Sequence, residues 1–279
     1  MVQPSSGRGN TQIEHRMTAT NIVIGGTGIE VASNRGDFLA MLERQYAEFA
    51  SPVANSSIRL TVDVVDQAAA SAGDEDLRVQ REAGCWSITR GDFEARYDQV
   101  RRRGTVRQDV NRHSIDSVIR IIHTLALASE GGLLLHAASA IRNGSAFVFA
   151  GRSGAGKTTL SRHAPADACL LSDEISYVRK AGETFLAWGT PFTGELGTPG
   201  ANQSAPVKAL CFLRQAEENR LVPIEKAEAL RQLLTNVLFF ADDPDMVRQV
   251  FDTAGELVGC TETFQLNFTQ GGAAWELIQ

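Results

Sequence analysis

The chain has 279 residues, of which 43% are hydrophobic and 22% charged, and this composition is typical of a globular protein with a substantial core. Its 27 basic and 33 acidic residues give a formal charge of −6, which disfavours a surface devoted to neutralising nucleic-acid phosphates. Apolar runs fall short of the ~20 residues that a membrane-spanning helix needs. The four cysteines are scattered and show neither zinc-ligand nor disulfide spacing. We therefore expect a cytoplasmic protein that binds neither nucleic acid nor membrane.

The chain is expected to divide into three parts. Residues 1–16 are polar and predict a disordered leader, residues 17–110 predict a β-rich N-terminal domain, and residues 111–279 predict a larger domain. In the N-terminal domain, two short strands around a glycine turn are expected in residues 21–32, in preference to a dinucleotide-binding loop. A helix and then a meander are expected to follow, with a helix in 38–49, strands near 58–64, 77–80, 86–88 and 93–97, and an exposed loop in 66–76. The basic run 101–103 is interpreted as a solvated face.

The second part of the chain has longer apolar segments. A one-sided apolar helix over 114–127 ends at Gly131-Gly132, and two apolar strands, 133–141 and 146–150, flank the strong hairpin signal Asn143-Gly144. Further strands are predicted at 169–172, 175–178, 185–188 and 208–213, helices at 224–240 and 245–258, and a closing hairpin at 263–268 and 274–278. The DxxG-like segment 252–255 falls inside this second helix and is interpreted as helical.

One motif carries chemistry. The segment GRSGAGKT, residues 151–158, fits GxxxxGK[ST] after an apolar strand and before a short helix. Glycines let backbone N–H groups turn toward phosphate oxygens, and the following helix N-terminus would add positive potential. Lys157 is expected to bridge the terminal phosphates of ATP, and Thr158 to contribute a hydroxyl to Mg²⁺. The predicted nucleotide-binding residues are Gly151, Arg152, Ser153, Gly154, Ala155, Gly156, Lys157, Thr158 and Thr159.

A magnesium–triphosphate complex needs a further carboxylate, usually at the end of a strand adjoining the loop strand. Asp173 ends the apolar run 168–172, and Glu174 follows it directly. Because successive strand side chains point to opposite faces, both can face the metal only if the strand ends there. We expect one carboxylate to hold metal and the other to take a substrate proton, with a merely solvated acidic pair as the alternative.

The predicted hairpin places a histidine beside this motif. With Asn143-Gly144 as a two-residue turn, continuing the ladder puts His136 opposite Gly151. His136 is therefore a candidate partner of a terminal phosphate or an acidic neighbour, or else a structural histidine. The loop 191–200 is either a cover for the substrate or a plain connector. Arg214 and Lys208 are weaker candidates for additional positive charge.

The order LLLHAASAIRNGSAFVFAGRSGAGKTTL, followed by LLSDEISYV, resembles the catalytic domain of HPr kinase/phosphorylase and its relatives over about residues 133–178. More loosely, GTPF, PVKALCFL and the two C-terminal helices resemble HPr-kinase-related proteins, including kinases that tailor lasso-peptide precursors. The resemblance implies an α/β (α+β) fold, namely a P-loop nucleotide-binding domain of the HPr kinase and PEP carboxykinase type with a smaller β-rich N-terminal domain. It also implies γ-phosphoryl transfer from ATP to a serine hydroxyl.

Carried over by position, the resemblance gives roles to three side chains. Asp173 lies on the first member of the family's acidic pair and is the preferred base and metal neighbour, Glu174 lies on the second, and His136 matches the family histidine. The family has two aspartates at this pair, so the division of roles stays open. We expect an ATP- and Mg²⁺-dependent kinase acting on a Ser or Thr of a peptide or small protein, and homo-oligomer formation is compatible with this. The alternatives are a nucleotide-binding regulatory or assembly module and a small-molecule kinase.

Overall fold

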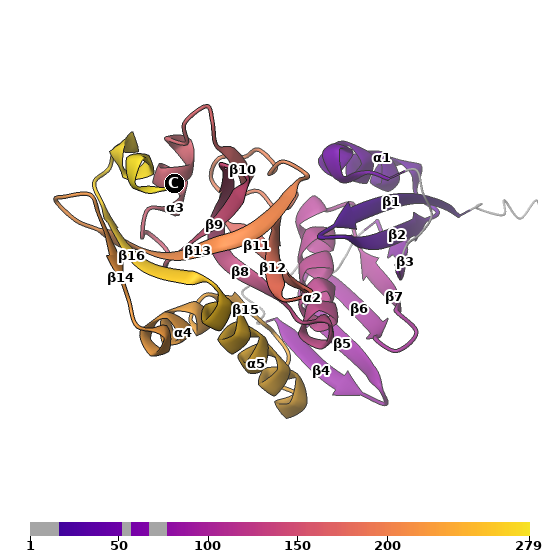
Figure 1. Ribbon diagram of the computed structural model, residues 1–279. Coiled ribbons are helices and arrows are strands. Elements are labelled where there is room, and N and C mark those ends of the chain that lie inside the picture. The colour runs from indigo at the N-terminus through magenta and orange to yellow at the C-terminus, as the bar shows by residue number, and fades with distance from the viewer. Residues whose placement is uncertain (1–16, 52–56, 67–76) are drawn as a thin grey trace, which may run out of the picture.

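The computed structural model describes residues 17–51, 57–66 and 77–279, and it shows a mixed α/β protein of the α+β kind with two sheets. The first sheet comes from the N-terminal part of the chain and the second from the rest, and α2 lies between them (Figure 1). The predicted leader 1–16 and most of the predicted loop 66–76 lie outside the described residues.

The first sheet has the strand order β1-β2-β3-β7-β6-β5-β4. Its strands are β1 (Thr18–Ile24), β2 (Thr27–Ser33), β3 (Ile58–Val64), β4 (Arg78–Glu82), β5 (Cys85–Arg90), β6 (Phe93–Asp98) and β7 (Arg103–Gln108). Helix α1 (Gly36–Gln45) and the 3-10 turn η1 (Ala47–Phe49) cover one face with α2. The predicted hairpin of β1 and β2 is confirmed, and Gly25 and Gly26 adopt φ of +60° and +76° in its turn.

The prediction of a meander is wrong in one respect. Strands β2, β3 and β7 pair in parallel, and α1 provides the crossover between β2 and β3. Strand β7 was missed because its start belongs to the basic run 101–103, which was interpreted only as a solvated face. Arg103, Thr105 and Arg107 are indeed exposed, on the open face of the sheet, while Val106 is buried on the other face. A half-exposed strand can therefore be rich in arginine.

Helix α2 (Arg112–Glu130) confirms the predicted helix, but the expectation of a single apolar side is wrong, because residues 121–128 are all buried. The side chain of Asn111 caps its start by accepting the N–H of His113 at 2.9 Å, and Gly131 ends it in the left-handed conformation with φ of +68°. Residues along most of its length are buried against both sheets. A continuous core of buried side chains thus joins the two sheets through this helix.

The second sheet has the path β10-β8-β11-β12-β13-β16-β14, with β9 also paired to β8 and β13, and β15 paired to β8. Its strands are β8 (Gly132–Arg142), β9 (Ser145–Ala150), β10 (Cys169–Ser172), β11 (Ile175–Ala181), β12 (Thr184–Trp188), β13 (Ser204–Gln215), β14 (Arg220–Pro223), β15 (Val237–Leu238) and β16 (Glu262–Phe268). The helices are α3 (Lys157–Arg162), α4 (Lys226–Leu234), α5 (Pro244–Cys260) and the 3-10 helix η2 (Gly272–Leu277).

Both faces of this sheet are covered at its centre. Alternate residues of β9 belong to two separate cores: Val148 packs into the core that includes α4 and α5, whereas Phe147 and Phe149 pack into a smaller core with α3 and η2. A strand buried on both sides reads as a continuous apolar run, as the AFVFA segment does. Figure 1 shows α4 and α5 on one side of the sheet and α3 with the C-terminus on the other.

The C-terminal predictions need two corrections. The predicted helix 224–240 ends at Leu234, and residues 237–238 form β15 because they pair with β8. The predicted closing hairpin is wrong: residues 272–277 form η2, because both edges of β16 are already taken by β13 and β14. The interpretation of residues 252–255 as helical is confirmed, since they lie within α5.

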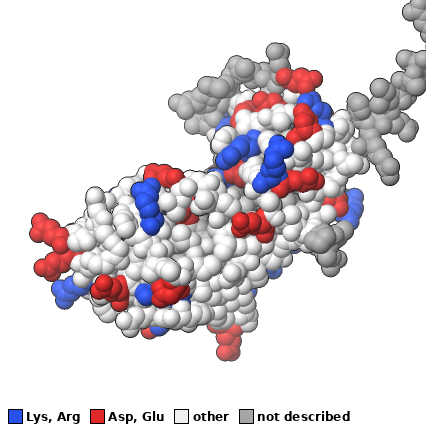
Figure 2. All heavy atoms as spheres, turned by 90° about the horizontal axis from the view of Figure 1, so that it is seen from above, with Lys and Arg blue, Asp and Glu red and all other residues white. Residues whose placement is uncertain are grey.

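The described surface has mixed charge. Basic and acidic side chains alternate on the face that Figure 2 shows, with large uncharged areas between them. None of the helices in the described part of the chain is long and apolar enough to cross a membrane.

Candidate functional site

Residues 151–156, called here the glycine-rich loop, connect β9 to α3. Gly154 and Gly156 adopt φ of +77° and +107°, a region that favours glycine. A Cβ on Gly156 would lie 2.4 Å from the Cζ atom of Phe268, so no larger residue fits there. Gln215 at the end of β13 donates its Nε2–H to the carbonyl of Gly154 at 2.8 Å. Conformation, packing and a hydrogen bond together fix this loop.

Lys157 lies under the loop that precedes it. Its side chain is largely buried, and its Nζ donates to the carbonyls of Gly151 at 2.8 Å and Arg152 at 3.4 Å. Burial lowers the pKa of Lys157, while the carboxylates of Glu174 and Glu195 raise it. Helix α3 begins at Lys157 and has six residues, and of the described residues Lys157 is the one lysine or arginine that lines the cavity beside the loop.

A cavity of about 200 Å³ opens above this loop. It is lined by His136, Ser153, Gly154, Gly156, Lys157, Thr158, Thr159, Asp173, Glu174, Gly194, Glu195 and Gln215. The structure thus brings together most of the predicted site residues. The exceptions are Gly151, Arg152 and Ala155, which line a separate cleft on α4.

The two predicted carboxylates lie in the turn between β10 and β11. Strand β10 ends at Ser172, whose Oγ accepts the N–H groups of Glu174 at 3.1 Å and Ile175 at 2.8 Å. The strand therefore ends where both carboxylates can face the cavity. The expected neighbourhood is wrong in one detail, because β10 pairs with β8 and does not adjoin β9. Since β8 is antiparallel to both strands, β10 and β9 run in the same direction and end at the same edge of the sheet.

Asp173 and Glu174 have different surroundings. The Oδ1 and Oδ2 atoms of Asp173 accept the N–H groups of Gly194 and Leu196, each at 3.0 Å, so this buried carboxylate fixes the loop 191–200. The carboxylate of Glu174 accepts no hydrogen bond from the described residues. Burial raises the pKa of Glu174, and the positive charge of Arg120 opposes that rise. Glu174 is thus the carboxylate that is free to accept a proton.

The register predicted for His136 is confirmed. Ala137 pairs with Ala150 in the β8–β9 ladder, so the next position places His136 at the level of Gly151. The backbone N–H of His136 donates to the carbonyl of Asn236 at 2.7 Å, and its side chain lines the cavity. Burial lowers the pKa of His136, and the nearby charge of Lys157 lowers it further. The imidazole is therefore neutral at neutral pH.

Sequence reasoning missed Glu195, Gly194 and Gln215. Glu195 is the only acidic residue in the loop 191–200, and that isolation in a glycine- and proline-rich segment was a usable signal. The contact of Gln215 with the glycine-rich loop has no local signal, because it depends on the parallel pairing of β13 with β9. The loop 191–200 forms part of the cavity wall and is thus more than a plain connector.

The two weaker candidates lie elsewhere. Lys208 donates its Nζ to the carbonyl of Gln279 at 2.6 Å and lies 5.9 Å from the ring centroid of Phe147, away from the cavity. The expectation that Lys208 adds charge to the site is wrong. Arg214 lines the separate cleft on α4.

Within the described residues, no group of three or more His, Cys, Asp or Glu side chains is placed to hold a metal ion. Thr158 and Asp173 both line the cavity, and each carboxylate oxygen has a second lone pair beyond the one that its backbone hydrogen bond uses. These oxygens fit Mg²⁺ as a partial ligand set that phosphate oxygens and water would complete.

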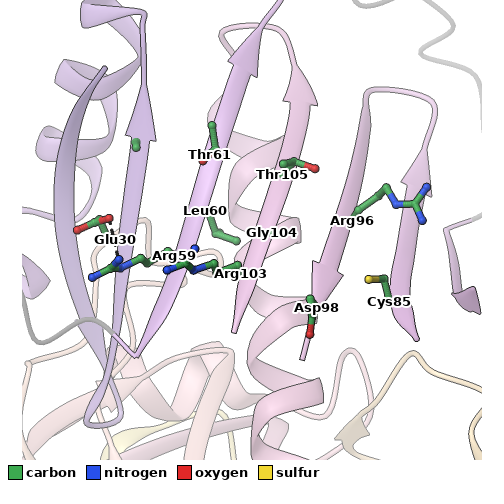
Figure 3. A pocket seen from close by; sticks show the side chains of 11 residues that line it. Glu30, Arg59, Leu60, Thr61, Cys85, Arg96, Asp98, Arg103, Gly104 and Thr105 are labelled. Atoms are coloured by element: carbon green, nitrogen blue, oxygen red, sulfur yellow. Dashed lines mark ion pairs between the residues drawn. The ribbon is translucent and has the colours of Figure 1, made fainter. Parts of the chain in front are cut away.

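Another hollow, of about 450 Å³, lies on the open face of the first sheet (Figure 3). There the guanidinium group of Arg59 pairs with Glu30 at 3.7 Å, and Arg103 extends beside them. Arg96 points away from that pair, toward β5. These side chains do not converge on one point, and the hollow contains no lysine or histidine. We therefore place the candidate site at the glycine-rich loop.

A family model described as SynChlorMet cassette protein ScmC matches residues 103–279 of the chain. The matched segment contains β7, α2 and the whole second sheet, and with them the glycine-rich loop, His136, Asp173 and Glu174. It leaves out the first six strands. A search of curated proteins found no match.

Proposed function

We propose that this chain, which belongs to the family of the SynChlorMet cassette protein ScmC, is an ATP- and Mg²⁺-dependent kinase. It would transfer the γ-phosphoryl group to a Ser or Thr hydroxyl of a peptide or small protein. The observation that carries the proposal is the convergence on one cavity of the glycine-rich loop, Lys157, Thr158, His136 and three carboxylates, two of them Asp173 and Glu174. We further propose that residues 111–279 form a P-loop domain of the HPr kinase and PEP carboxykinase type.

The phosphate end of the nucleotide has a defined set of binding groups. Loop amides and the ammonium group of Lys157 would bind the β- and γ-phosphates, with the nucleotide drawing Lys157 away from the carbonyls that it now contacts. Thr158 and one oxygen of Asp173 would hold Mg²⁺, which neutralises phosphate charge when bound. Asp173 also fixes the wall formed by residues 191–200 through its two hydrogen bonds.

The proton acceptor is Glu174 in this proposal. The acceptor hydroxyl gives its proton to the Glu174 carboxylate while its oxygen bonds to the γ-phosphorus, and the bond from that phosphorus to the β–γ bridging oxygen breaks to release ADP. Sequence reasoning preferred Asp173 as the base. The two backbone hydrogen bonds of Asp173 and the free carboxylate of Glu174 favour the opposite assignment. Neutral His136 would donate or accept a hydrogen bond at the transferring phosphate.

A cytoplasmic location is part of this proposal and rests on the proposed co-substrate. ATP is available in the cytoplasm, and the cysteines Cys85, Cys169, Cys211 and Cys260 are free thiols, as a reducing compartment favours. We therefore propose a cytoplasmic enzyme.

A transfer assay tests the kinase proposal. The full-length protein would be incubated with γ-labelled ATP, Mg²⁺ and candidate acceptors, first of all the polypeptides encoded beside it, because the family is described as a cassette protein. We expect label on a Ser or Thr, and a loss of about a thousandfold in Lys157→Ala. Lys180→Ala removes an exposed lysine that pairs only with Glu256 and serves as the matched control.

The transfer assay and a melting-temperature measurement together distinguish the kinase from a module that binds nucleotide without catalysis. A nucleotide-dependent rise in the melting temperature with no labelled product on any acceptor would contradict the kinase and favour a regulatory nucleotide-binding module. Equal transfer by wild type and Lys157→Ala would contradict the assignment of the site.

A further inference from the structure

A second cleft, of about 610 Å³, lies between the glycine-rich loop and α4. We call it the arginine cleft. It is lined by Gly151, Arg152, Ala155, Phe212, Leu213, Arg214, Glu228, Arg231, Gln232, Thr235, Asn236 and Gln265. Its volume falls within the range typical of ligand pockets and is about three times that of the phosphate-sized cavity.

The arginine cleft shares a wall with the candidate active site. Gly151, Arg152 and Ala155 face the cleft, whereas the other residues of the same loop face the cavity. The Nζ of Lys157 contacts the carbonyls of Gly151 and Arg152, and so lies directly behind this wall. A ligand in the cleft would therefore lie next to the terminal phosphate.

A second contact joins the two spaces. The carbonyl of Asn236, a buried residue of the cleft, accepts the backbone N–H of His136 at 2.7 Å, and the side chain of His136 lines the cavity. The cleft and the cavity are thus neighbours along β8 as well as along the loop.

The charge of the cleft is positive in a chain whose formal charge is −6. It contains three guanidinium groups and one carboxylate, and that carboxylate, Glu228, pairs with Arg231 at 2.5 Å. Arg152 and Arg214 form no ion pair with any described residue, which leaves two positive charges uncompensated. Guanidinium groups pair with carboxylates through two parallel hydrogen bonds and are suited to recognise them.

The lining offers no exposed aromatic ring on which a nucleobase could stack. Its one aromatic residue, Phe212, is only 1% exposed. Gln232 and Gln265 donate their Nε2–H groups to Glu228 at 2.8 Å and to the carbonyl of Phe212 at 3.4 Å, and their amide oxygens can accept N–H groups of a peptide backbone.

We propose that the arginine cleft binds an acidic segment of the acceptor polypeptide beside the hydroxyl to be phosphorylated. This inference rests on the proposed kinase function and adds the chemical class of its acceptor. Arg214, whose charge is uncompensated, is the main specificity-determining residue, and Arg231, which is paired with Glu228, contributes less. With acidic side chains bound in the cleft, a nearby acceptor hydroxyl would reach past the shared wall into the cavity that Glu174 lines.

Binding rather than activity provides the test. A fluorescent peptide of sequence Glu-Glu-Ser-Glu-Glu would be titrated with the full-length protein without nucleotide, next to the neutral peptide Gln-Gln-Ser-Gln-Gln. We expect the acidic peptide to bind and the neutral peptide not to bind. The affinity for the acidic peptide should fall about tenfold in Arg214→Glu, and it should fall further in the double variant Arg214→Glu, Arg231→Glu. Arg248→Glu changes an exposed arginine of α5 outside the cleft and should stay within about twofold of wild type.

Nucleotide binding, measured as the rise in melting temperature with ATP and Mg²⁺, is the second readout. An unchanged rise in Arg214→Glu, together with weaker peptide binding, supports the cleft as a peptide site. Equal peptide affinity in wild type and the double variant overturns the proposal. A loss of the ATP-dependent rise in melting temperature with peptide affinity intact also overturns it, because the cleft would then bind the nucleoside part of ATP. If the acidic peptide binds through Arg214 but no phosphate is transferred, the cleft stands and only the kinase assignment fails.

Discussion

The two sheets of this protein differ in how their faces are used. In the first sheet, strands such as β3 and β6 alternate strictly between buried and exposed positions, so one face packs on α1 and α2 and the other faces solvent. In the second sheet, β8 and β9 are buried on both faces over most of their length, and β13 is buried on both faces over residues 209–213. The candidate site lies at the strand ends of this covered sheet.

The difference has a physical basis. A sheet covered on both faces holds its strand ends rigidly, and loops that leave such ends can place backbone amides and side chains within hydrogen-bond distance of a ligand. The open face of the first sheet leaves its charged side chains in solvent, where they interact weakly. The family match agrees with this division, because it includes the second sheet entirely and only β7 of the first. Substitutions should therefore have large effects at the second sheet and small ones on the open face.

The largest effect is expected at Glu174. Replacing it with glutamine removes the proposed base and should reduce the transfer rate by about a hundredfold to ten-thousandfold in the γ-label assay, with the ATP-dependent rise in melting temperature retained. Because burial raises the pKa of Glu174 above its ordinary value of 4.5, the wild-type rate should fall with decreasing pH already above 4.5. Glu183→Gln, in an exposed turn, is the control. A Glu174→Gln variant with the wild-type rate and pH profile would return the role of base to Asp173.

Two glycines with positive φ allow the sheets to be compared directly. Gly156→Ala combines backbone strain with a methyl group 2.4 Å from the ring of Phe268, and should cost about 2 to 5 kcal/mol of unfolding free energy and abolish the ATP-dependent rise in melting temperature. Gly84→Ala, in the turn between β4 and β5, has φ of +83° but nothing within 4 Å, and should cost about 1 to 2 kcal/mol. Urea unfolding measures both. Equal costs would mean that the loop can shift away from Phe268.

His123 on α2 tests the junction between the sheets. Burial lowers its pKa to about 3, and its ring contacts Tyr177 of the second sheet, whose hydroxyl lies 3.2 Å from Thr27 of the first. Below pH 6.5 the unfolded chain takes up a proton that the folded protein does not bind, so the free energy of unfolding should fall by about 1.4 kcal/mol per pH unit down to about pH 3.

The variant His123→Leu should lose this contribution to the pH dependence, while His163→Gln, which changes an exposed histidine, should keep it. Unfolding by urea at several pH values gives both slopes. A His123→Leu slope equal to that of wild type would show that water reaches His123 in the folded protein.

The smallest effect is expected on the open face of the first sheet. Arg107 on β7 is paired in register with Asp63 on β3 and Glu94 on β6, and its Nε lies 4.0 Å from Asp63. These side chains are exposed, so Arg107→Ala should cost only about 0.2 to 1 kcal/mol of unfolding free energy, and the difference should vanish in about 1 M salt. The rate of phosphoryl transfer should not change. A cost that persists at high salt would indicate packing by the arginine stem.

Much of this protein follows from its sequence alone, because the relevant information is local. The Asn143-Gly144 turn fixed the β8–β9 register, and with it the level of His136 beside Gly151. The continuous apolar run before the glycine-rich loop predicted the strand β9, and the end of an apolar run at Ser172 predicted a strand that stops before the two carboxylates. Turn conformation, side-chain alternation and glycine spacing act over a few residues and can be identified without the fold.

The tertiary structure decided the rest, because pairings between distant segments depend on which strand edges are free. Strand β8 lies between β10, which leads to Asp173 and Glu174, and β9, which leads to the glycine-rich loop. Residues 237–238 form a strand because they pair with β8. The segment η2 is helical because both edges of β16 already have partners. The different roles of Asp173 and Glu174 also arise this way. Only the folded chain brings the amides of Gly194 and Leu196 to Asp173 and leaves Glu174 free, since those amides lie about twenty residues further along the chain.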